Sequence, residues 1–285
     1  MRPQVDALVA LTHLSLEQDA ELVAAVTGID VVLGGHEHEN WLMQRGARFV
    51  PVIKADANVR SLAVVSLTFG APGTPAVVSS GLQPIDERIA FDPAVRARVD
   101  EWVQRGYDGF RRDGFTPEAV VATTTEPLDG RESTVRNRSG KLTDLIAAAI
   151  AREGGDVYVA IYNAGSIRID DVLPPGPITE YDVIRVLPFG GKVVKAELDG
   201  ELLARVLDTG VNNEGTGGYL QTWGVRKEGG AWLVQGKPID PARRYRVAIT
   251  DFLLTGGEAN LSYLTRANPQ VHDVQELRDM RRAVI

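Results

Sequence analysis

Three of the chain's four histidines, His13, His36 and His38, lie within its first 40 residues. Each follows an apolar run that predicts a β-strand, and open α/β sheets bind ligands at the carboxyl ends of their strands. Gly34 and Gly35 would let the second loop pass close to a bound ion, and an extended backbone would turn His36 and His38 to the same side. This arrangement of imidazoles predicts a site for a divalent metal ion. The residues alone leave an equal alternative open, in which the three histidines are unrelated loop residues.

Short elements of both kinds must position these histidines. Ser15 and Gln18 form a capping-box pattern that begins a helix through Val26. Strands are expected at Val5 to Leu11, Ile29 to Leu33, Phe49 to Lys54, Leu62 to Phe69 and Ala76 to Leu82. We therefore predict a small mixed α/β domain over residues 1–90.

A charged amphipathic segment follows this domain. Asp92-Pro93 is typical of a helix start, and the apolar residues up to Arg112 fall on one stripe, so we predict a linker helix within residues 91–115. The pattern then restarts, and residues 116–285 predict a second α/β or α+β domain. Its expected elements are a helix from Gly140 to Arg152, a strand from Val157 to Tyr162, helices near Thr179 and Glu201, strands up to Val247, and a final helix after His272.

The composition excludes several classes of protein. With 285 residues, of which 44% are hydrophobic and 24% charged, the chain is apolar enough to fold. The absence of cysteine excludes a disulfide scaffold, a thiolate-bound metal and a thiol nucleophile. The formal net charge of −7 gives no diffuse positive field, so we expect no nucleic-acid partner. Since no apolar run approaches about 18 residues, we also expect no membrane span.

Longer motifs carry a resemblance to a known family. The segment LVALTHLSLEQDAELVAAVTGIDVVLGGHEHE resembles the second half of a calcineurin-like metallophosphoesterase domain. The segments VRNRSGKLTDLIAAAI, YNAGSIR, ITEYDVIRVLPFGG, GGYLQ and ITDFLLTGGEANL follow in the order found in the C-terminal domain of the 5′-nucleotidase family. This family includes periplasmic UDP-sugar hydrolases and 2′,3′-cyclic-nucleotide phosphodiesterases. The resemblance implies the C-terminal half of an αββα sandwich, a linker helix and a 5′-nucleotidase C-terminal α/β domain.

The resemblance also implies a function. It predicts a metallophosphoesterase of nucleotide catabolism that hydrolyses phosphate esters of nucleotides or nucleotide derivatives, with a dinuclear centre of zinc, manganese or similar ions. Its ligand is a nucleotide or nucleoside, and its location is periplasmic or extracellular. The implied metal ligands are His13, His36 and His38, and the implied substrate-binding residues are Arg136, Asn163, Arg168, Phe189, Phe252 and Glu258.

The physical properties of these substrate-binding residues suit their implied roles. Guanidinium groups hold phosphate or carboxylate oxygens and ribose hydroxyls, Asn163 would contact the base, and the two phenylalanines would sandwich it. By pattern alone, the phenylalanines also fit core positions, Arg136 together with Arg138 fits a solvated helix start, and Asn163 fits a turn. Lys141 stands near a family asparagine, and Glu258-Ala259 replaces an aspartate and a small residue, so the preferred base does not transfer.

Family members carry D-x-H, G-D-x-x-D and G-N-H-E motifs before the position of Val5, and the chain has none of them. Two-metal hydrolysis needs a carboxylate that bridges the ions. We therefore expect an N-terminally incomplete chain with its catalytic residues elsewhere, an incomplete metal site, poor phosphate release and association through an exposed sheet edge. The alternatives are that Asp56 or Glu39 completes the centre, that the three histidines form a mononuclear zinc hydrolase, or that the chain is an inactive nucleotide-binding module.

Overall fold

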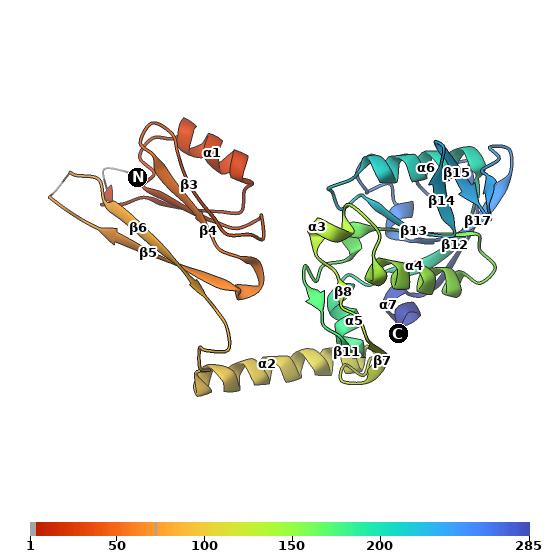
Figure 1. Cartoon of the computed structure of the whole chain (residues 1–285), viewed down its shortest axis with the longest axis horizontal. Coiled ribbons are helices and arrows are strands. Elements are labelled where there is room, and N and C mark those ends of the chain that lie inside the picture. Colours follow the sequence, from red (N-terminus) through yellow and green to blue (C-terminus); the bar gives the residue numbers. More distant parts are fainter. Residues whose placement is uncertain (1–3, 72) are drawn as a thin grey trace. The chain divides into compact units, whose positions relative to one another are not determined.

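The computed structural model describes residues 4–71 and 73–285, which form two compact units of mixed α/β structure (Figure 1). The units comprise Met1–Asp100 and Glu101–Ile285, so the division between them falls inside helix α2 (Pro93–Arg112). The α/β class expected from the sequence is confirmed. Within the described residues, no helix is both long enough and apolar enough to cross a bilayer.

Unit 1 contains a four-stranded sheet in the order β1-β2-β4-β3. Its strands are β1 (Val9–Thr12), β2 (Val31–Gly34), β4 (Val50–Lys54) and β3 (Trp41–Arg45). The first three are parallel to one another, and β3 runs antiparallel to β4. Helix α1 (Leu16–Ala25) begins at the predicted capping box of Ser15 and Gln18, and it packs Val23 against Val32 and Val52 of the sheet.

Strand β1 begins at Val9, so the predicted start at Val5 is wrong. Just before it, the backbone N–H of Leu8 donates to a carboxylate oxygen of Asp30 at 2.8 Å, and the backbone N–H of Asp30 donates to the Leu8 carbonyl oxygen at 2.9 Å. β1 is an edge strand of its sheet, and Leu11 is 85% exposed. Association through this edge stays a prediction.

Two further elements complete the N-terminal part of the chain. β5 (Ser61–Thr68) and β6 (Val77–Pro84) form an antiparallel ribbon. Helix α2 follows, and the carboxylate of Asp92 accepts hydrogen bonds from the N–H groups of Ala94 and Val95, which fits the helix start predicted there. No residue of α2 is buried.

Unit 2 is built on a five-stranded sheet in the order β13-β9-β17-β12-β18. Its strands are β13 (Leu220–Trp223), β9 (Val159–Asn163), β17 (Arg244–Thr250), β12 (Lys192–Asp199) and β18 (Val271–Asp279). β9 and β17 are parallel, and the other neighbours are antiparallel. Smaller elements surround this sheet, namely β7 (Val120–Thr124), β8 (Leu128–Asp129), β10 (Val172–Leu173), β11 (Gly176–Thr179), β14 (Val225–Glu228), β15 (Ala231–Val234) and β16 (Lys237–Pro238).

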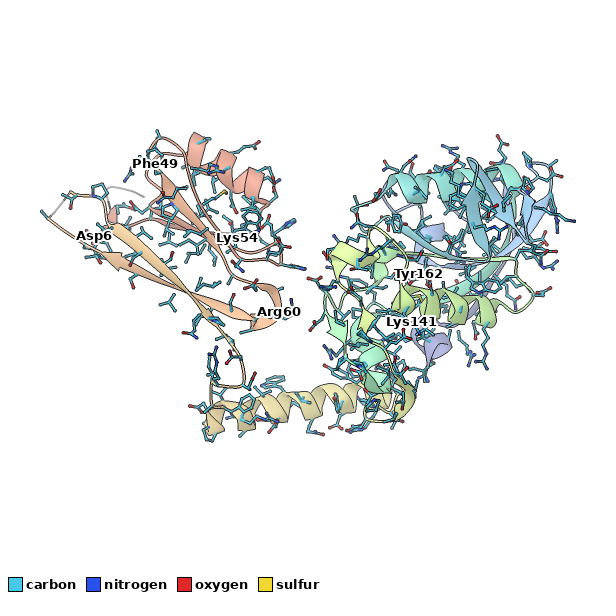
Figure 2. The ribbon with its side chains drawn as sticks, viewed as in Figure 1. Asp6, Phe49, Lys54, Arg60, Lys141 and Tyr162 are labelled. Atoms are coloured by element: carbon cyan, nitrogen blue, oxygen red, sulfur yellow. The ribbon has the colours of Figure 1, made fainter. Side chains whose placement is uncertain are left out.

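Helices cover both faces of this sheet, and each face has its own apolar core (Figure 1). One core contains α4 (Lys141–Gly154), α5 (Glu180–Val186) and α7 (Met280–Val284), and the other contains α6 (Gly200–Asn212). Alternate strand residues enter opposite cores, as the pleat requires: Ala160 lies in the first and Ile161 in the second. Tyr162, labelled in Figure 2, ties β9 to α4 because its hydroxyl donates to the Thr143 carbonyl oxygen at 3.1 Å.

The predicted helix after His272 is wrong over most of its length. Residues Val271–Asp279 form strand β18, and only Met280–Val284 is helical. The segment pairs with β12 with two shifts of register, and these backbone hydrogen bonds override the helix-forming tendency of its glutamate, leucine and arginine residues.

A charged turn leads into the short helix α3 (Glu132–Val135). The carboxylate of Asp129 accepts hydrogen bonds from the Arg131 guanidinium at 2.7 and 2.9 Å and from the Thr134 hydroxyl at 2.9 Å. The hydrogen bond from Arg131 is the main reason why the pKa of Asp129 falls from 3.8 to about 2. This turn therefore fixes where α3 begins.

Two leucines of α4 allow a matched test of the first core. Leu142 is 6% exposed and Leu145 is 51% exposed on the same helix. We expect Leu142→Ala to lower the free energy of unfolding by about 2–5 kcal/mol, because it leaves a cavity, and Leu145→Ala to lower it by less than about 1 kcal/mol. Urea unfolding at pH 7 measures both values. Equal losses for the two variants would contradict the packing described.

The Asp129 turn predicts a pH-dependent contribution to stability. Because the folded-state pKa lies below the unfolded value, the ionised carboxylate stabilises the fold above about pH 4, and this contribution disappears as the pH falls towards 2. We expect Asp129→Asn to cost about 1–2 kcal/mol at pH 7 and progressively less below pH 4. Urea unfolding across this range measures the difference from wild type. Asp100→Asn, which removes an exposed pair with Arg96, is the control and should cost less than about 0.5 kcal/mol. A loss for Asp129→Asn that does not change with pH would refute the role of its charge.

Candidate functional site

Strand pairing brings four loops of unit 2 to one end of its sheet. β9 and β17 run in parallel and end at Asn163 and Thr250, so the loops that follow them lie side by side. β12 runs antiparallel to β17, and its Val193 pairs with Thr250, which brings the loop before β12 to the same end. The loop before β13 joins them because Leu220 pairs with Asn163. The end of β9 carries Asn163, and these loops carry four more of the six predicted substrate-binding residues: Arg168, Phe189, Phe252 and Glu258.

Asn163 and Glu258 are joined at this end of the sheet. The amide nitrogen of Asn163 donates to Glu258 Oε2 at 2.7 Å, and its amide oxygen accepts from the Ser166 hydroxyl at 2.7 Å. Asn163 is buried, and these contacts fix the orientation of its amide. The longer side chain of Glu258, relative to the aspartate expected there, reaches the asparagine directly.

Sequence reasoning missed Asn213, a buried residue that holds the neighbouring loops. Its amide nitrogen donates to the carbonyl oxygens of Gly218 at 3.2 Å and Ala259 at 2.8 Å, and its amide oxygen accepts from Asn260 at 2.7 Å. Asn213 thus joins the loop before β13 to the loop that contains Glu258. No motif marked it, because its partners lie as far as 47 residues away along the chain.

The two predicted arginines share one carboxylate, that of Glu132. Arg136 donates to Glu132 Oε1, and the guanidinium of Arg168 lies 3.6 Å from the same oxygen. Nε of Arg136 is buried and has no hydrogen-bond partner in the structure. Sequence reasoning missed Glu132, although its spacing of four residues from Arg136 on a helix was a usable signal.

Both predicted aromatic residues are exposed, so the alternative that they are core residues is wrong. Phe189 is 74% exposed and Phe252 is 46% exposed. The guanidinium carbon of Arg168 lies 5.9 Å from the centre of the Phe189 ring. Their two loops touch, because a Cβ added to Gly191 would lie 2.8 Å from an Asp251 carboxylate oxygen. Exposed rings beside cationic groups could stack on a planar aromatic ligand.

Lys141, which is labelled in Figure 2, begins α4 near the position of the expected family asparagine, and it pairs with another side chain. Its ammonium lies 3.0 Å from Glu126 Oε2, and both side chains are exposed. The position therefore carries an ion pair in this chain.

In unit 1 the structure brings two of the three predicted metal ligands together. The rings of His13 and His36 lie 5.5 Å apart, centre to centre, at 66° to each other. The extended backbone assumed for His36 and His38 is wrong, because their φ angles are 93° and 62°. Residues other than glycine rarely adopt positive φ angles. Where they do, the strained positions cluster at functional sites. Over residues 4–71 and 73–285 there is no group of three histidine, aspartate or glutamate side chains placed to hold a metal ion.

The two alternative carboxylate ligands have different surroundings. Asp56 accepts hydrogen bonds from the Ser61 hydroxyl at 2.5 Å and from the Asn40 amide at 2.9 and 3.1 Å. These hydrogen bonds hold the pKa of Asp56 below its usual value. Asp56 thus anchors the end of the histidine loop through Asn40, whereas Glu39 is exposed.

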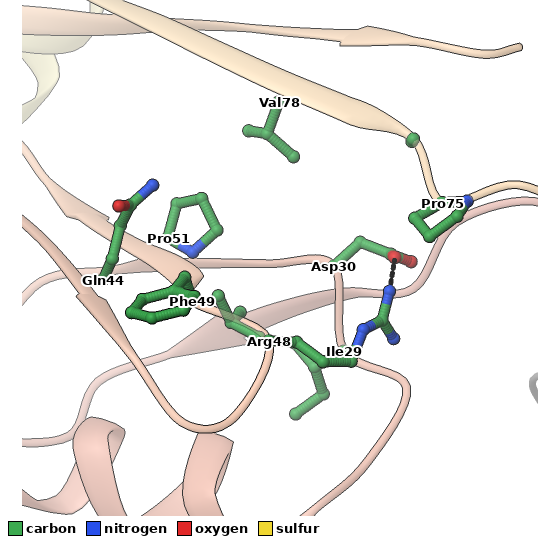
Figure 3. A pocket seen from close by; sticks show the side chains of 10 residues that line it. Ile29, Asp30, Gln44, Arg48, Phe49, Pro51, Pro75 and Val78 are labelled. Carbon is green, nitrogen blue, oxygen red and sulfur yellow. Dashed lines mark ion pairs between the residues drawn. The ribbon is translucent and has the colours of Figure 1, made fainter.

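Unit 1 also contains a pocket of about 180 Å³ that includes none of the predicted site residues (Figure 3). Arg48 lies at its rim, 3.6 Å from the buried carboxylate of Asp30. Its other lining residues are Ile29, Gln44, Phe49, Val50, Pro51, Pro75, Ala76 and Val78.

The C-terminal part of the chain matches a known family. Residues 120–265 match the family model for the 5′-nucleotidase C-terminal domain. The trifunctional nucleotide phosphoesterase YfkN of Bacillus subtilis is 28% identical over 283 residues, which cover 90% of this chain and 18% of that protein. The 5′-nucleotidase of Homo sapiens is 27% identical over 318 residues, covering 90% of this chain and 54% of that protein.

Solved structures show the same fold. The crystal structure of a 5′-nucleotidase precursor from Thermus thermophilus has a TM-score of 0.78 and 22% identity, and the match covers 99% of this chain and 60% of that one. The chain thus spans about half the length of its human relative and about three fifths of the Thermus chain. Since the family model alone covers just over half of the sequence, the chain belongs to the 5′-nucleotidase family through its C-terminal domain.

Proposed function

We propose that the chain binds a nucleotide at the loop end of the unit 2 sheet and takes part in metal-dependent hydrolysis of nucleotide phosphate esters. The observation that carries the proposal is the pairing of Arg136 and Arg168 with one carboxylate, next to the exposed ring of Phe189. Family membership supports the hydrolase class. We place this activity in the periplasm or outside the cell, as the resemblance implies.

Each group at this end has a distinct role in the proposal. The free face of the two guanidinium groups binds phosphate or ribose oxygens, and Glu132 keeps them in place by neutralising part of their charge. Phe189 and Phe252 stack on the base. Asn163, oriented by Glu258 and Ser166, donates to or accepts from the edge of the base.

The histidines of unit 1 have donor chemistry that fits a divalent cation. Two imidazoles bound tetrahedrally to one zinc ion, with Zn–N bonds of about 2.0–2.1 Å, have ring centres about 5 Å apart. The rings of His13 and His36 are 5.5 Å apart. A bound ion would polarise a phosphoryl oxygen and lower the pKa of a water molecule. We propose that His13 and His36 hold such an ion; among the described residues, His38 does not form a group of three with them.

A second candidate function is nucleotide binding without turnover. The groups proposed to hold the nucleotide all lie in unit 2, whereas the three histidines lie in unit 1. Binding therefore does not require the histidines, and an inactive nucleotide-binding module would keep the whole unit 2 site.

Metal content and phosphate release together distinguish these functions. Because two or three histidines cannot hold two ions without a bridging carboxylate, we expect less than about one tightly bound ion per chain and slow or no phosphate release from AMP. Plasma mass spectrometry of the purified chain and an assay with added Mn²⁺ or Zn²⁺ measure both. About two ions per chain with rapid release would contradict this expectation and would assign the full activity to these residues.

Removal of either exposed ring tests the nucleotide site directly. We expect Phe252→Ala and Phe189→Ala each to weaken AMP binding roughly 5- to 150-fold, because one stacked base contributes about 1–3 kcal/mol. Calorimetry with AMP measures the dissociation constants. Phe69→Ala, which removes an exposed phenylalanine of unit 1, is the matched control and should leave AMP binding unchanged. Wild-type chain that binds no AMP, or ring variants that bind like wild type, would refute the site.

A further inference from the structure

Lys54 is a fully buried lysine at the carboxyl end of β4, and it is labelled in Figure 2. Its ammonium lies 2.6 Å from the carbonyl oxygen of Leu14, 2.5 Å from Glu37 Oε2 and 3.0 Å from Asp19 Oδ2. A buried ammonium is costly unless its charge and its three N–H groups are matched. Two hydrogen bonds, from Lys54 to Leu14 and to Glu37, and an ion pair with Asp19 offset that cost here.

Two of the three oxygens around Lys54 come from the segments that carry the histidines, and the third, from Asp19, comes from α1. Leu14 directly follows His13, and Glu37 directly follows His36. The second carboxylate oxygen of Glu37 accepts the backbone N–H of Leu16 at 2.8 Å, in the first turn of α1. Lys54 and Glu37 therefore connect the His13 loop to the His36 loop through contacts between residues 17–40 positions apart.

The His36 loop has a backbone conformation that needs such support. The positive φ angles at His36 and His38 are unfavourable for these residues, and they persist only where the surroundings fix them. Packing at the start of the loop is tight as well. A Cβ on Gly34 would lie 2.8 Å from the Thr12 hydroxyl oxygen and 3.2 Å from Lys54 Cε. The loop is thus held by polar contacts and by close packing at its base.

We propose that Lys54 is a positioning residue, which acts through Glu37 to hold the imidazoles of His13 and His36 at a spacing where both can bind one divalent cation. The proposal rests on the proposed function for the presence of a cation at these histidines, and it goes further by naming the groups that arrange them. In the proposed arrangement Lys54 contacts neither the cation nor the substrate. Its role depends on the length of its side chain and on its hydrogen bond to Glu37.

Charge and geometry predict opposite changes in the affinity for a cation when Lys54 is removed. Lys54, Glu37 and Asp19 together carry one net negative charge, and Glu37 Oε1 lies 3.7 Å from His36 Nδ1. Removing the ammonium makes the surroundings more negative, which by charge alone would strengthen binding of a cation. Loss of the connection between the loops would weaken it. The direction of the change therefore separates the two roles.

The test compares Lys54→Met with wild type in the full chain, with Zn²⁺ alone as the probe. We expect the dissociation constant for Zn²⁺ to rise about 10- to 100-fold, as is usual when a group that orients metal ligands is removed. We also expect faster amide hydrogen exchange over residues 34–40. Lys227→Met, which removes an exposed lysine paired with Asp208, is the control and should change neither. Unchanged or tighter Zn²⁺ binding by folded Lys54→Met would overturn the proposal.

Glu37→Gln keeps the proposal testable if Lys54→Met does not fold. This variant preserves shape and leaves an amide oxygen for one of the two hydrogen bonds, and we expect weaker Zn²⁺ binding by the folded protein. The four histidines give four NMR signals, and His272, which pairs with Asp199 in unit 2, serves as an internal reference. In wild type the His13 and His36 signals should respond to Zn²⁺ together, and in Glu37→Gln they should respond at different concentrations.

AMP binding separates failure of this inference from failure of the proposed function. The nucleotide site lies in unit 2, so Lys54→Met and Glu37→Gln should bind AMP like wild type. Folded Glu37→Gln that binds both Zn²⁺ and AMP like wild type would overturn the positioning role and leave the nucleotide site intact. Wild-type chain that binds AMP but no Zn²⁺ would also overturn the positioning role. Wild-type chain that binds no AMP would instead refute the proposed function.

Discussion

The parallel pairing of β9 with β17 determines where the proposed nucleotide site of unit 2 is located. It places the ends of two strands separated by more than 80 residues next to each other, and the antiparallel pairing of β12 then adds a third loop. These two pairings bring Asn163 and the loops that carry Phe189 and Phe252 to one end of the sheet. Because side chains alternate between the two cores, a slip of one residue would exchange the faces of β9 and misplace Asn163. The core residues of the sheet therefore determine the geometry of the site as much as the polar residues do.

Local signals predicted the parts of the fold that local interactions determine. The capping box of Ser15 and Gln18 begins α1, and the apolar stripe from Leu142 to Ile150 forms the buried face of α4. The segment from Val271 to Asp279 was predicted wrongly, because pairing with β12 determines its structure and a single sequence does not reveal that pairing. The extended backbone predicted at His36 was wrong for a related reason. Its conformation depends on contacts with β4 and α1 that are distant in the sequence.

The candidate site likewise contains residues that local motifs predict and residues that only distant contacts reveal. Motifs pointed to the arginines and the aromatic residues, and the structure adds the residues that hold them. Glu132 pairs with both arginines, Asn213 joins two loops, and Lys54 joins two histidine segments. None of these three binds a ligand in the roles described, so no ligand-based motif would include them. The spacing of Glu132 and Arg136 suggests their pairing, but the partners of Asn213 and Lys54 can be identified only from a folded chain, because they lie up to 47 residues away along the chain.

The unpartnered Nε of Arg136 has a consequence for selectivity. In the free protein this N–H group is covered by neighbouring atoms and is left as an unsatisfied donor, which costs about 1–3 kcal/mol. Glu132 holds the other part of the guanidinium. In the proposed nucleotide site, a ligand oxygen would reach the group only after the covering atoms move, and it would then recover this cost. An analogue without that oxygen would not recover it, so the proposed site would favour ligands that carry the acceptor.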